Sequence, residues 1–354
     1  MQRIRVALAG IGNAASAFLQ GINFYSNDVI PDVVYESVGG FRITDINITA
    51  AFDVAANKVG KPLEDAIFAE PNNCPKYTEV IPTNILVQMG PVLDGVTGPT
   101  KSVVKVSDAK EADIVSILKD SNTDILVVLL PSGSNEAVKA YAQAAIDAGC
   151  AFVNATPTPI VTDPTWVKKF KAADLPVVGD DLQSLAGGTR IHKGLLEMLD
   201  SIGLHIENTY QLDVSGGLEG LTTLDTDRRM WKRRIKTESI RRVLPYLSEN
   251  DLTSGTTDYL DFLGNRRTGY FWIQANAFMK APLLIDITVK SLDGPNGAAT
   301  LVDVVRAVKI GLNRAVGGPL LSVCAYGFKL STVFISEQEA GLWFEEFIEG
   351  RRMN

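Results

Sequence analysis

The sequence predicts an α/β fold: a doubly wound parallel sheet, followed by a second domain with a sheet of its own. Two observations support this prediction. The first half alternates short apolar strands, which end in glycine or small polar residues, with helical segments, as doubly wound sheets do. After Gly188 the chain changes to strand-like runs with few helical crossovers, which predicts an antiparallel sheet.

The first strand, turn and helix lie near the N-terminus. Residues 4–10 are an apolar strand-like run, and the apolar periodicity that follows to about Tyr25 predicts a helix. The turn between them has the pattern G-x-G-x-x-A at Gly10, Gly12 and Ala15. The first glycine allows the backbone angles of the turn, the second lets a pyrophosphate approach the main chain, and the helix N-terminus attracts the phosphate charge. We therefore expect a dinucleotide site here.

The second strand is predicted at residues 46–54 and carries Asp53 near its end. An acidic residue at this place binds the ribose hydroxyls of adenosine and favours NAD over NADP. Asp53 follows Gly10 by 43 residues, which is about twice the usual spacing, so we expect an insertion over roughly residues 26–45. Residues 55–119 contain proline- and asparagine-rich patches and no clear repeat.

Three further strands of the parallel sheet are predicted from apolar runs, at residues 124–131, 152–154 and 175–179. Asn135 is expected to cap a helix over residues 136–148, which Gly149 ends. The carboxyl ends of parallel strands meet at one edge of the sheet, where such folds bind their ligand. We therefore expect the polar residues after these strands to face the cofactor: Ser132, Asn154, Asp180 and Asp181. The last two could instead cap a helix.

The second half is predicted to contain helices over residues 191–204, about 297–315 and 337–348, and strands over residues 209–215, 270–277 and 283–290. No low-complexity linker separates the two halves. We therefore expect the two domains to pack tightly against each other.

The composition restricts the class of protein. At 354 residues the chain is long enough for two domains, and its 46% apolar and 21% charged residues are typical of a globular protein. No apolar run is as long as a membrane span and no signal-peptide pattern precedes the first strand, so we expect no membrane partner. Three cysteines without metal-ligand spacing favour a reducing cytoplasm and no metal site. The acidic balance argues against general nucleic-acid binding.

One segment reverses this acidic charge. Residues 228–242 carry eight basic side chains in a chain with a net charge of −7. Such a segment can bind an anion or supply ammonium groups as acids and bases, although a charge run is most often a solvated helix face. A spacing of four places Lys232 and Lys236 on one face if the segment is helical. The two histidines, His192 and His205, are expected to be ordinary surface or core residues.

Nearly the whole chain resembles the myo-inositol-1-phosphate synthase family, in particular its shorter bacterial and archaeal branch. In the first half the resemblance rests on GIGNAAS (Gly10–Ser16), AAFDV (Ala50–Val54), PTNILVQMGPVLDG (Pro82–Gly95), LPSGS (Leu130–Ser134), AIDAGCAFVNATP (Ala145–Pro157) and VGDDLQS (Val178–Ser184). In the second half it rests on SLDGPNGA (Ser291–Ala298), VVRAVKI (Val304–Ile310), GGPL (Gly317–Leu320) and CAYGFK (Cys324–Lys329). A set of this size is far more specific than a single glycine motif.

The resemblance implies a redox-neutral conversion of D-glucose 6-phosphate to 1D-myo-inositol 3-phosphate by tightly held NAD, as part of inositol and phospholipid biosynthesis. C5 is oxidised to a ketone, the adjacent C6 loses a proton, the enolate closes onto the C1 aldehyde, and hydride returns to C5. The implied architecture is a Rossmann-type NAD-binding domain (residues 1–189), an inserted α+β catalytic and tetramerisation domain (190–310) and a C-terminal return (311–354). The implied assembly is a cytoplasmic homotetramer.

The same resemblance gives roles to individual residues. The catalytic residues are expected to be Lys232, Lys236, Lys329, Arg267 and Asp293. NAD contacts are expected from Gly10, Gly12, Asn13, Ala14, Asp53, Ser132, Asn154, Asp180 and Asp181, and substrate contacts from Ser184 and Thr189. Clustered lysines suit this chemistry because burial and neighbouring cations lower a lysine's pKa. Fixed cations also stabilise an enolate and an alkoxide.

The substrate half departs from the family at several positions. Gln183 stands where the family usually has lysine, and Gly217 and Leu218 lie in the run of residues 215–219, which usually contains asparagine. The resemblance implies that these positions line the cofactor and substrate site. Arg267 falls on a third lysine position, and arginine cannot give up a proton. These departures leave open a paralogous NAD-dependent cyclase or dehydrogenase that acts on another sugar phosphate.

Two other classes of protein also stay open. One is a catalytically inactive NAD-binding protein, which the retention of Lys232, Lys236 and Lys329 together opposes. The other is a nucleic-acid-binding protein that uses residues 228–242. It would need a broad positive face, and the acidic balance of the rest of the chain opposes this.

Overall fold

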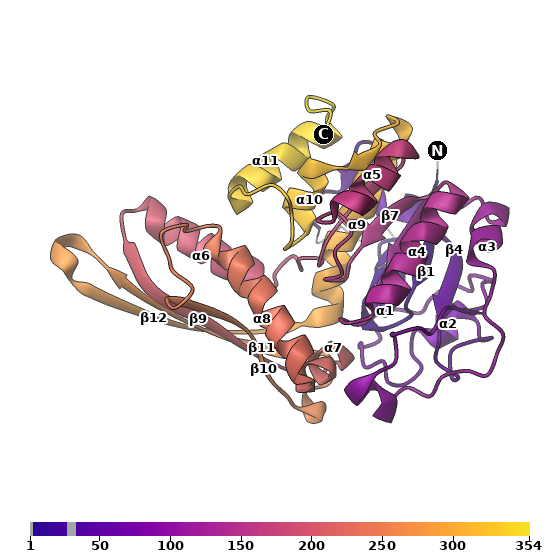
Figure 1. Ribbon diagram of the computed structural model, residues 1–354, viewed down its shortest axis with the longest axis horizontal. Coiled ribbons are helices and arrows are strands. Elements are labelled where there is room, and N and C mark those ends of the chain that lie inside the picture. Colours follow the sequence, from indigo (N-terminus) through magenta and orange to yellow (C-terminus); the bar gives the residue numbers. More distant parts are fainter. Residues whose placement is uncertain (1–2, 27–32) are drawn as a thin grey trace.

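The computed structural model describes residues 3–26 and 33–354, and two large sheets organise this part of the chain (Figure 1). The larger sheet has seven strands in the order β13-β8-β7-β6-β1-β4-β5, and all its pairings are parallel. Its strands are β1 (Ile4–Ala9), β4 (Ile46–Asp53), β5 (Gln88–Met89), β6 (Ile125–Val128), β7 (Ala151–Asn154), β8 (Pro176–Val178) and β13 (Gly318–Pro319). The strand order runs outward in both directions from β1, which confirms the predicted doubly wound, Rossmann-type sheet.

Helices from both ends of the chain pack around this sheet. They are α1 (Asn13–Phe24), α2 (Leu63–Ala66), α3 (Ile114–Asp120), α4 (Asn135–Ala148), α5 (Pro164–Ala172), α9 (Asp293–Asn313), α10 (Leu321–Gly327) and α11 (Glu337–Ile348). Helix α1 packs against α9, and α3 packs against α4. The chain therefore leaves the sheet after β8 and returns to it through α9 and β13. The domain limits at residues 189 and 310 stay predictions.

The start of α4 differs from the prediction. Asn135 is the first helical residue and does not cap the helix, because its Oδ1 accepts a hydrogen bond from Thr158 Oγ1 at 2.9 Å. Two N–H groups of the first turn donate instead to a carboxylate that is distant in sequence. Asp94 accepts hydrogen bonds from Glu136 N at 2.8 Å and Ala137 N at 3.0 Å. The other end follows the prediction, since Gly149 ends the helix in a left-handed conformation with φ +75°.

The second sheet has four strands in the order β10-β9-β11-β12. They are β9 (His205–Ser215), β10 (Leu252–Tyr259), β11 (Arg266–Asn276) and β12 (Pro282–Leu292). Strands β9, β11 and β12 are antiparallel as predicted, but β10 pairs with β9 in parallel. The prediction of a purely antiparallel sheet is therefore wrong at this pairing. The cause is α8 (Thr226–Arg241), which connects β9 to β10 as a helical crossover.

Two helices cover one face of the second sheet. Figure 1 shows the sheet as a long arm beside the parallel sheet, with α6 (Gly188–Ser201) and α8 along one face. Their apolar residues form a core with the strands, for example Leu196 of α6, Ile240 of α8 and Ile273 of β11. Among the described residues, no helix covers the opposite face of the arm.

The predicted insertion near residues 26–45 is described only in part. Residues 27–32 lie outside the described residues. The rest contains a small hairpin of β2 (Ser37–Val38) and β3 (Phe41–Arg42), followed by a 3-10 turn, η1 (Ile43–Asp45). The buried guanidinium of Arg306 donates hydrogen bonds to backbone carbonyls beside this hairpin. None of the described helices is long and apolar enough to cross a membrane.

Candidate active site

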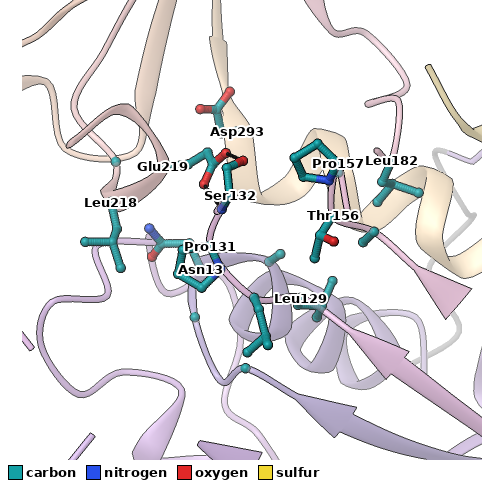
Figure 2. Close-up of a pocket in the computed structure, with 18 of the residues that line it drawn as sticks. Asn13, Leu129, Pro131, Ser132, Thr156, Pro157, Leu182, Leu218, Glu219 and Asp293 are labelled. Atoms are coloured by element: carbon teal, nitrogen blue, oxygen red, sulfur yellow. Dashed lines mark hydrogen bonds between the residues drawn. The ribbon is translucent and has the colours of Figure 1, made fainter. Parts of the chain in front are cut away.

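One cavity of about 330 Å³ lies between the carboxyl ends of the parallel strands and the second sheet. Fourteen of the sixteen residues predicted for the site line it: Gly10, Gly12, Asn13, Ala14, Asp53, Ser132, Asp181, Ser184, Thr189, Lys232, Lys236, Arg267, Asp293 and Lys329. The structure therefore brings residues from the two halves of the sequence into one space (Figure 2). Asn154 and Asp180 are not among the lining residues.

The glycine turn forms one end of the cavity. Gly10 has φ +92°, and a Cβ there would lie 2.8 Å from the carbonyl oxygen of Leu129, so the turn needs glycine. Gly12 precedes α1, and a Cβ on it would have open space around it. The first N–H groups of α1 have no partner within the helix. The turn therefore has the open main-chain surface that a pyrophosphate requires.

Asp53 lies beside this turn and is held by main-chain groups. Its Oδ2 accepts a hydrogen bond from Ile11 N at 2.8 Å, and its Oδ1 accepts from Val54 N at 2.7 Å and Ala55 N at 2.9 Å. The Nζ of Lys58 lies 3.9 Å from Oδ2. Asp53 thus holds the glycine turn through Ile11 N, and its predicted contact with the adenosine ribose stays a prediction.

Asn13 and Ser132 line the middle of the cavity (Figure 2). The Oδ1 of Asn13 accepts hydrogen bonds from Asn73 N at 2.8 Å and Cys74 N at 2.9 Å. The Oγ of Ser132 donates a hydrogen bond of 2.5 Å to Glu219 Oε1. Ser132 thus joins the carboxyl end of β6 to the short helix α7 (Leu218–Leu221) of the other half.

Asn154 and Asp180 lie beneath the cavity, and both are fully buried. The amide of Asn154 donates to Asp180 Oδ1 at 2.7 Å, while Ile160 N and Thr162 N donate to Asp180 Oδ2 at 3.0 and 3.1 Å. These bonds tie the loop after β7 to the loop after β8. The structure does not bring Asn154 and Asp180 to the surface where a cofactor would bind, because their polar atoms are used in this buried network.

The three predicted lysines meet at the other end of the cavity. Lys232 and Lys236 are buried on the same face of α8, as their spacing predicts. Each lysine contacts a carboxylate. Lys232 contacts Glu219, Lys236 Nζ lies 2.5 Å from Asp213 Oδ2, and Lys329 Nζ lies 2.8 Å from Asp181 Oδ1.

Arg267 and Asp293 form a bidentate ion pair beside these lysines. The Nε and Nη2 of Arg267 donate to the two oxygens of Asp293 at 2.7 and 2.8 Å. The Nη1 of Arg267 also lies 3.5 Å from Asp213 Oδ2. Burial disfavours the charged guanidinium, but Asp293 and Asp213 raise the pKa of Arg267 above its usual range. Arg267 therefore stays a fixed positive charge.

A second ion cluster lies where the chain departs from the family pattern at Gln183. The Nε2 of Gln183 donates to both oxygens of Glu337 at 2.9 and 3.0 Å. Arg190 Nε also donates to Glu337 at 3.0 Å, and Lys193 contacts the same carboxylate. A carboxylate only accepts hydrogen bonds, so the amide nitrogen of Gln183 must face Glu337.

Sequence reasoning missed several lining residues, above all Asp213 and Arg190, whereas Glu219 lies in the run of residues 215–219 that the resemblance placed at the site. The sequence carries only part of a signal for Asp213: Thr209, Gln211, Asp213 and Ser215 alternate along β9, and only the structure shows that all four are buried. A buried strand face made of polar residues indicates a site. Arg190 had no comparable signal, because its contacts are to residues distant in sequence, such as Glu337.

The remaining predictions for this region concern the arginines, the histidines and metal binding. None of the six arginines of residues 228–242 lines the cavity. His192 is buried and its Nε2 lies 2.7 Å from Thr209 Oγ1, so it is a core residue, while His205 is exposed. The described residues contain no group of three or more side chains that could hold a metal ion.

Known proteins are similar to this chain over almost its full length. A sequence profile for myo-inositol-1-phosphate synthase matches residues 187–294. The inositol-3-phosphate synthase of Mycolicibacterium smegmatis is 39% identical over 356 residues, covering 98% of each chain. The inositol-3-phosphate synthase of Mycobacterium tuberculosis is 40% identical over 352 residues, covering 98% of this chain and 96% of that one. The crystal structure of Ari2 aligns with a TM-score of 0.80 at 26% identity, covering 98% of this chain and 99% of that one. The chain therefore belongs to the myo-inositol-1-phosphate synthase family.

Proposed function

We propose that this protein converts D-glucose 6-phosphate to 1D-myo-inositol 3-phosphate and uses NAD without net oxidation. The observation that carries the proposal is the shared cavity, in which the glycine turn opens into the same space as Lys232, Lys236 and Lys329. An oxidation followed by an enolate addition needs a hydride carrier together with fixed cations. Similarity to inositol-3-phosphate synthases over 98% of the chain supports the same reaction.

The cofactor half of the cavity fits NAD. The open space at Gly12 and the free N–H groups at the start of α1 suit its pyrophosphate. The residues that would hold it are Gly10, Gly12, Asn13, Ala14, Asp53, Ser132 and Asp181. Asn154 and Asp180 act through the loops that they join. Bound NAD would supply a hydride acceptor that later becomes the hydride donor.

The other half supplies proton transfer and positive charge. One of the lysine amines accepts the proton of the C5 hydroxyl, because a base must lie within hydrogen-bond reach of it. The remaining amines and Arg267 stabilise the negative charge of the enolate and of the alkoxide that ring closure forms. Asp293 holds the Arg267 guanidinium in place through two hydrogen bonds. Ser184 and Thr189 add neutral donors for the sugar phosphate.

A second candidate function is the same kind of NAD-dependent chemistry on another sugar phosphate. It is favoured by the substrate half of the cavity, where a carboxylate contacts each lysine and the lining residue Gln183 is neutral, with its amide nitrogen bound to Glu337. A different balance of charge around the sugar would suit a different pattern of hydroxyl groups. The resulting enzyme would be a cyclase or a dehydrogenase.

The open face of the second sheet supports a homo-oligomer, which we propose to be a tetramer. Tyr210 and Trp272 stack on this face with ring centroids 5.7 Å apart, and Tyr270 and Leu284 are 47% and 60% exposed there. Exposed aromatic and apolar side chains that gather on one face often mark an interface. Sedimentation of the wild type should give four copies, and Tyr270→Glu should reduce that number. A monomeric wild type would contradict the proposal.

We also place the protein in the cytoplasm. Its three cysteines, Cys74, Cys150 and Cys324, are buried free thiols. Reduced cysteines persist in the cytoplasm, whereas secreted proteins tend to pair them. Fractionation of the source cells with an antibody would test this location, and recovery in a membrane or secreted fraction would contradict it.

One assay separates the candidate functions. Purified protein is incubated with glucose 6-phosphate and a catalytic amount of NAD, and the products are followed by ³¹P and ¹³C NMR and by NADH absorbance. Inositol phosphate without net NADH is the expected result. Steady formation of NADH would favour a dehydrogenase, and product from another sugar phosphate alone would favour the second candidate. Binding of NAD with no turnover on any sugar phosphate would indicate an inactive NAD-binding protein.

A further inference from the structure

Asp213 is a buried carboxylate at the centre of the cation cluster. Its side chain is 1% exposed and lines the cavity. Its Oδ2 lies 2.5 Å from Lys236 Nζ and 3.5 Å from Arg267 Nη1, and Gln211 Nε2 donates to both of its oxygens at 2.9 and 3.0 Å. Since Asp293 holds the other side of Arg267, charges alternate along a chain from Asp293 to Lys236.

Neighbouring glycines leave room for this carboxylate. Gly269 of β11 pairs with Asp213 across the sheet, and a Cβ on it would lie 3.1 Å from Asp213 Oδ1. Gly188 begins α6, and a Cβ there would lie 2.2 Å from Gln211 Nε2 and 3.4 Å from Asp213 Oδ1. Larger residues at these two positions would collide with the Asp213–Gln211 pair. The backbone around the pair thus fixes where the carboxylate can lie.

The charges around Lys236 oppose one another. The charged and titratable groups that face Lys236 or its partners are Asp213 (β9), Arg267 (β11), Lys232 (α8), Glu219 (α7), His192 (α6), Asp293 (α9) and Lys329 (after α10). Burial is the largest influence and lowers the pKa of Lys236 below its usual value, Arg267 and Lys329 lower it further, and Asp213 opposes this fall. Among the groups around Lys236 that shift its pKa, Asp213 is thus the one that favours the protonated amine. Asp213 itself is ionised, because Lys236 and Arg267 hold its pKa low although burial would raise it.

We propose that Asp213 is a positioning residue for the reaction: it fixes the Lys236 side chain in the cavity and keeps its amine protonated. Lys236 then enters the reaction as a fixed positive charge beside the enolate and alkoxide, and the base that accepts the C5 hydroxyl proton is another lysine. This inference rests on the function proposed above. It gives Lys232 and Lys236 different tasks, although both are buried on the same face of α8.

The pH dependence of turnover in Asp213→Asn tests this role. The substitution removes the carboxylate that favours the ammonium form, so the fall of kcat/KM on the alkaline side should move to lower pH by about one unit or more. Binding of glucose 6-phosphate to the NAD-loaded protein should not weaken, because one negative charge leaves a cavity that receives a dianion. A loss of turnover by the same factor at every pH would contradict the proposal.

Asp293→Asn is the matched control. It removes a carboxylate from the same chain of charges, but the cation that it contacts is Arg267. Arginine does not lose its proton in the accessible pH range. The alkaline limb of the control should therefore stay where it is in the wild type, whatever happens to its maximal rate. An equal shift in both variants would contradict a specific link between Asp213 and Lys236.

Lys236→Arg gives a second test that does not require a change at Asp213. A guanidinium can replace a fixed positive charge but cannot act as a base. Turnover should exceed that of Lys236→Ala by about tenfold or more. If Lys236→Arg is as inactive as Lys236→Ala, Lys236 needs to lose its proton and the proposal is wrong.

The failure of this inference can be told apart from the failure of the proposed function. A wild type that forms no inositol phosphate contradicts the proposed function before any variant is made. The pKa of the Lys236 amine can then be followed without turnover, from the pH dependence of its ¹³C chemical shift after reductive methylation. It should be lower in Asp213→Asn than in the wild type. Equal values in the two proteins would contradict the role of Asp213 under either outcome.

Discussion

The two ends of the cavity are built from different parts of the chain. At the glycine turn, main-chain groups form the surface, and the fit depends on the absence of a side chain at Gly12. At the lysine end, side chains from α8, β9, β11 and α9 form the surface, and a carboxylate contacts each cation. A main-chain surface changes only when its backbone changes. A surface of ion pairs changes when one charged partner is exchanged, so a single substitution can alter the lysine end more readily than the glycine turn.

The largest effect should come from removing single amines at the lysine end. Lys236→Ala and Lys329→Ala should each lower kcat by about 10³-fold or more, because each loses a charge or a proton carrier at the reacting atoms. The affinity for NAD, measured by titration calorimetry, should stay within about twofold of the wild type. Near-normal turnover in either variant would remove that lysine from the catalytic group. A joint loss of turnover and NAD binding would mean that the two ends are not independent.

Gly12→Val should have the opposite effect, because it should weaken the binding of NAD. A Cβ at Gly12 meets no atom within 4 Å, so the variant should fold with an unchanged midpoint of thermal unfolding. Its side chain would occupy the space that the pyrophosphate needs, and we expect the Kd for NAD to rise about 100-fold, or about 2.7 kcal/mol. Gly341→Val is the control, since Gly341 also has open space around it but lies in α11 and does not line the cavity. Unchanged NAD affinity in Gly12→Val would contradict a pyrophosphate site at the turn.

The sequence was informative where structure follows from local chemistry. The pattern at Gly10 and Gly12 predicts the turn because its backbone angles and close approaches require glycine. The buried run at β6 predicts a parallel strand because both of its faces are covered. The same local reasoning placed α11 at residues 337–348, with the bounds that the structure has.

It was less informative where partners come from distant segments. Strand β10 carries the polar sequence LTSGTTDY and was not predicted, because its burial comes from α8 and its parallel pairing comes from that helical crossover. The resemblance to the family brought Lys236 and Arg267 to attention but not Asp213, which joins them. Asn154 and Asp180 follow strands as cofactor-binding residues do, yet they bind each other beneath the cavity. In each case the missing information was which side chains meet in three dimensions.

Acid should weaken the second sheet through His192, which is buried between α6 and β11. Burial lowers the pKa of His192 to about 4, whereas a histidine in the unfolded chain titrates near 6.5. Between these values the unfolded chain binds a proton that the folded protein does not. The free energy of unfolding should therefore fall by up to about 3 kcal/mol as the pH drops from 6.5 to 4.

Denaturant unfolding of His192→Gln over this pH range measures that contribution. The variant should be less stable than the wild type at pH 7 but should lose stability more slowly on acidification. His205→Gln replaces an exposed histidine and should leave the wild-type slope unchanged. Parallel slopes for the wild type and His192→Gln would mean that acid acts elsewhere, for example on the carboxylates that contact the lysines.

The smallest effect should come from the outer face of α8, whose inner face carries Lys232 and Lys236. Arg233 and Arg234 are exposed and do not line the cavity, so replacing both by alanine should change kcat/KM by less than about twofold, as surface substitutions usually do. Any small loss should vanish at about 0.5 M salt, because exposed cations can only steer a dianionic substrate from a distance and salt screens that attraction. A loss that persists at high salt would mean that the basic segment contributes more to the reaction than its two buried lysines.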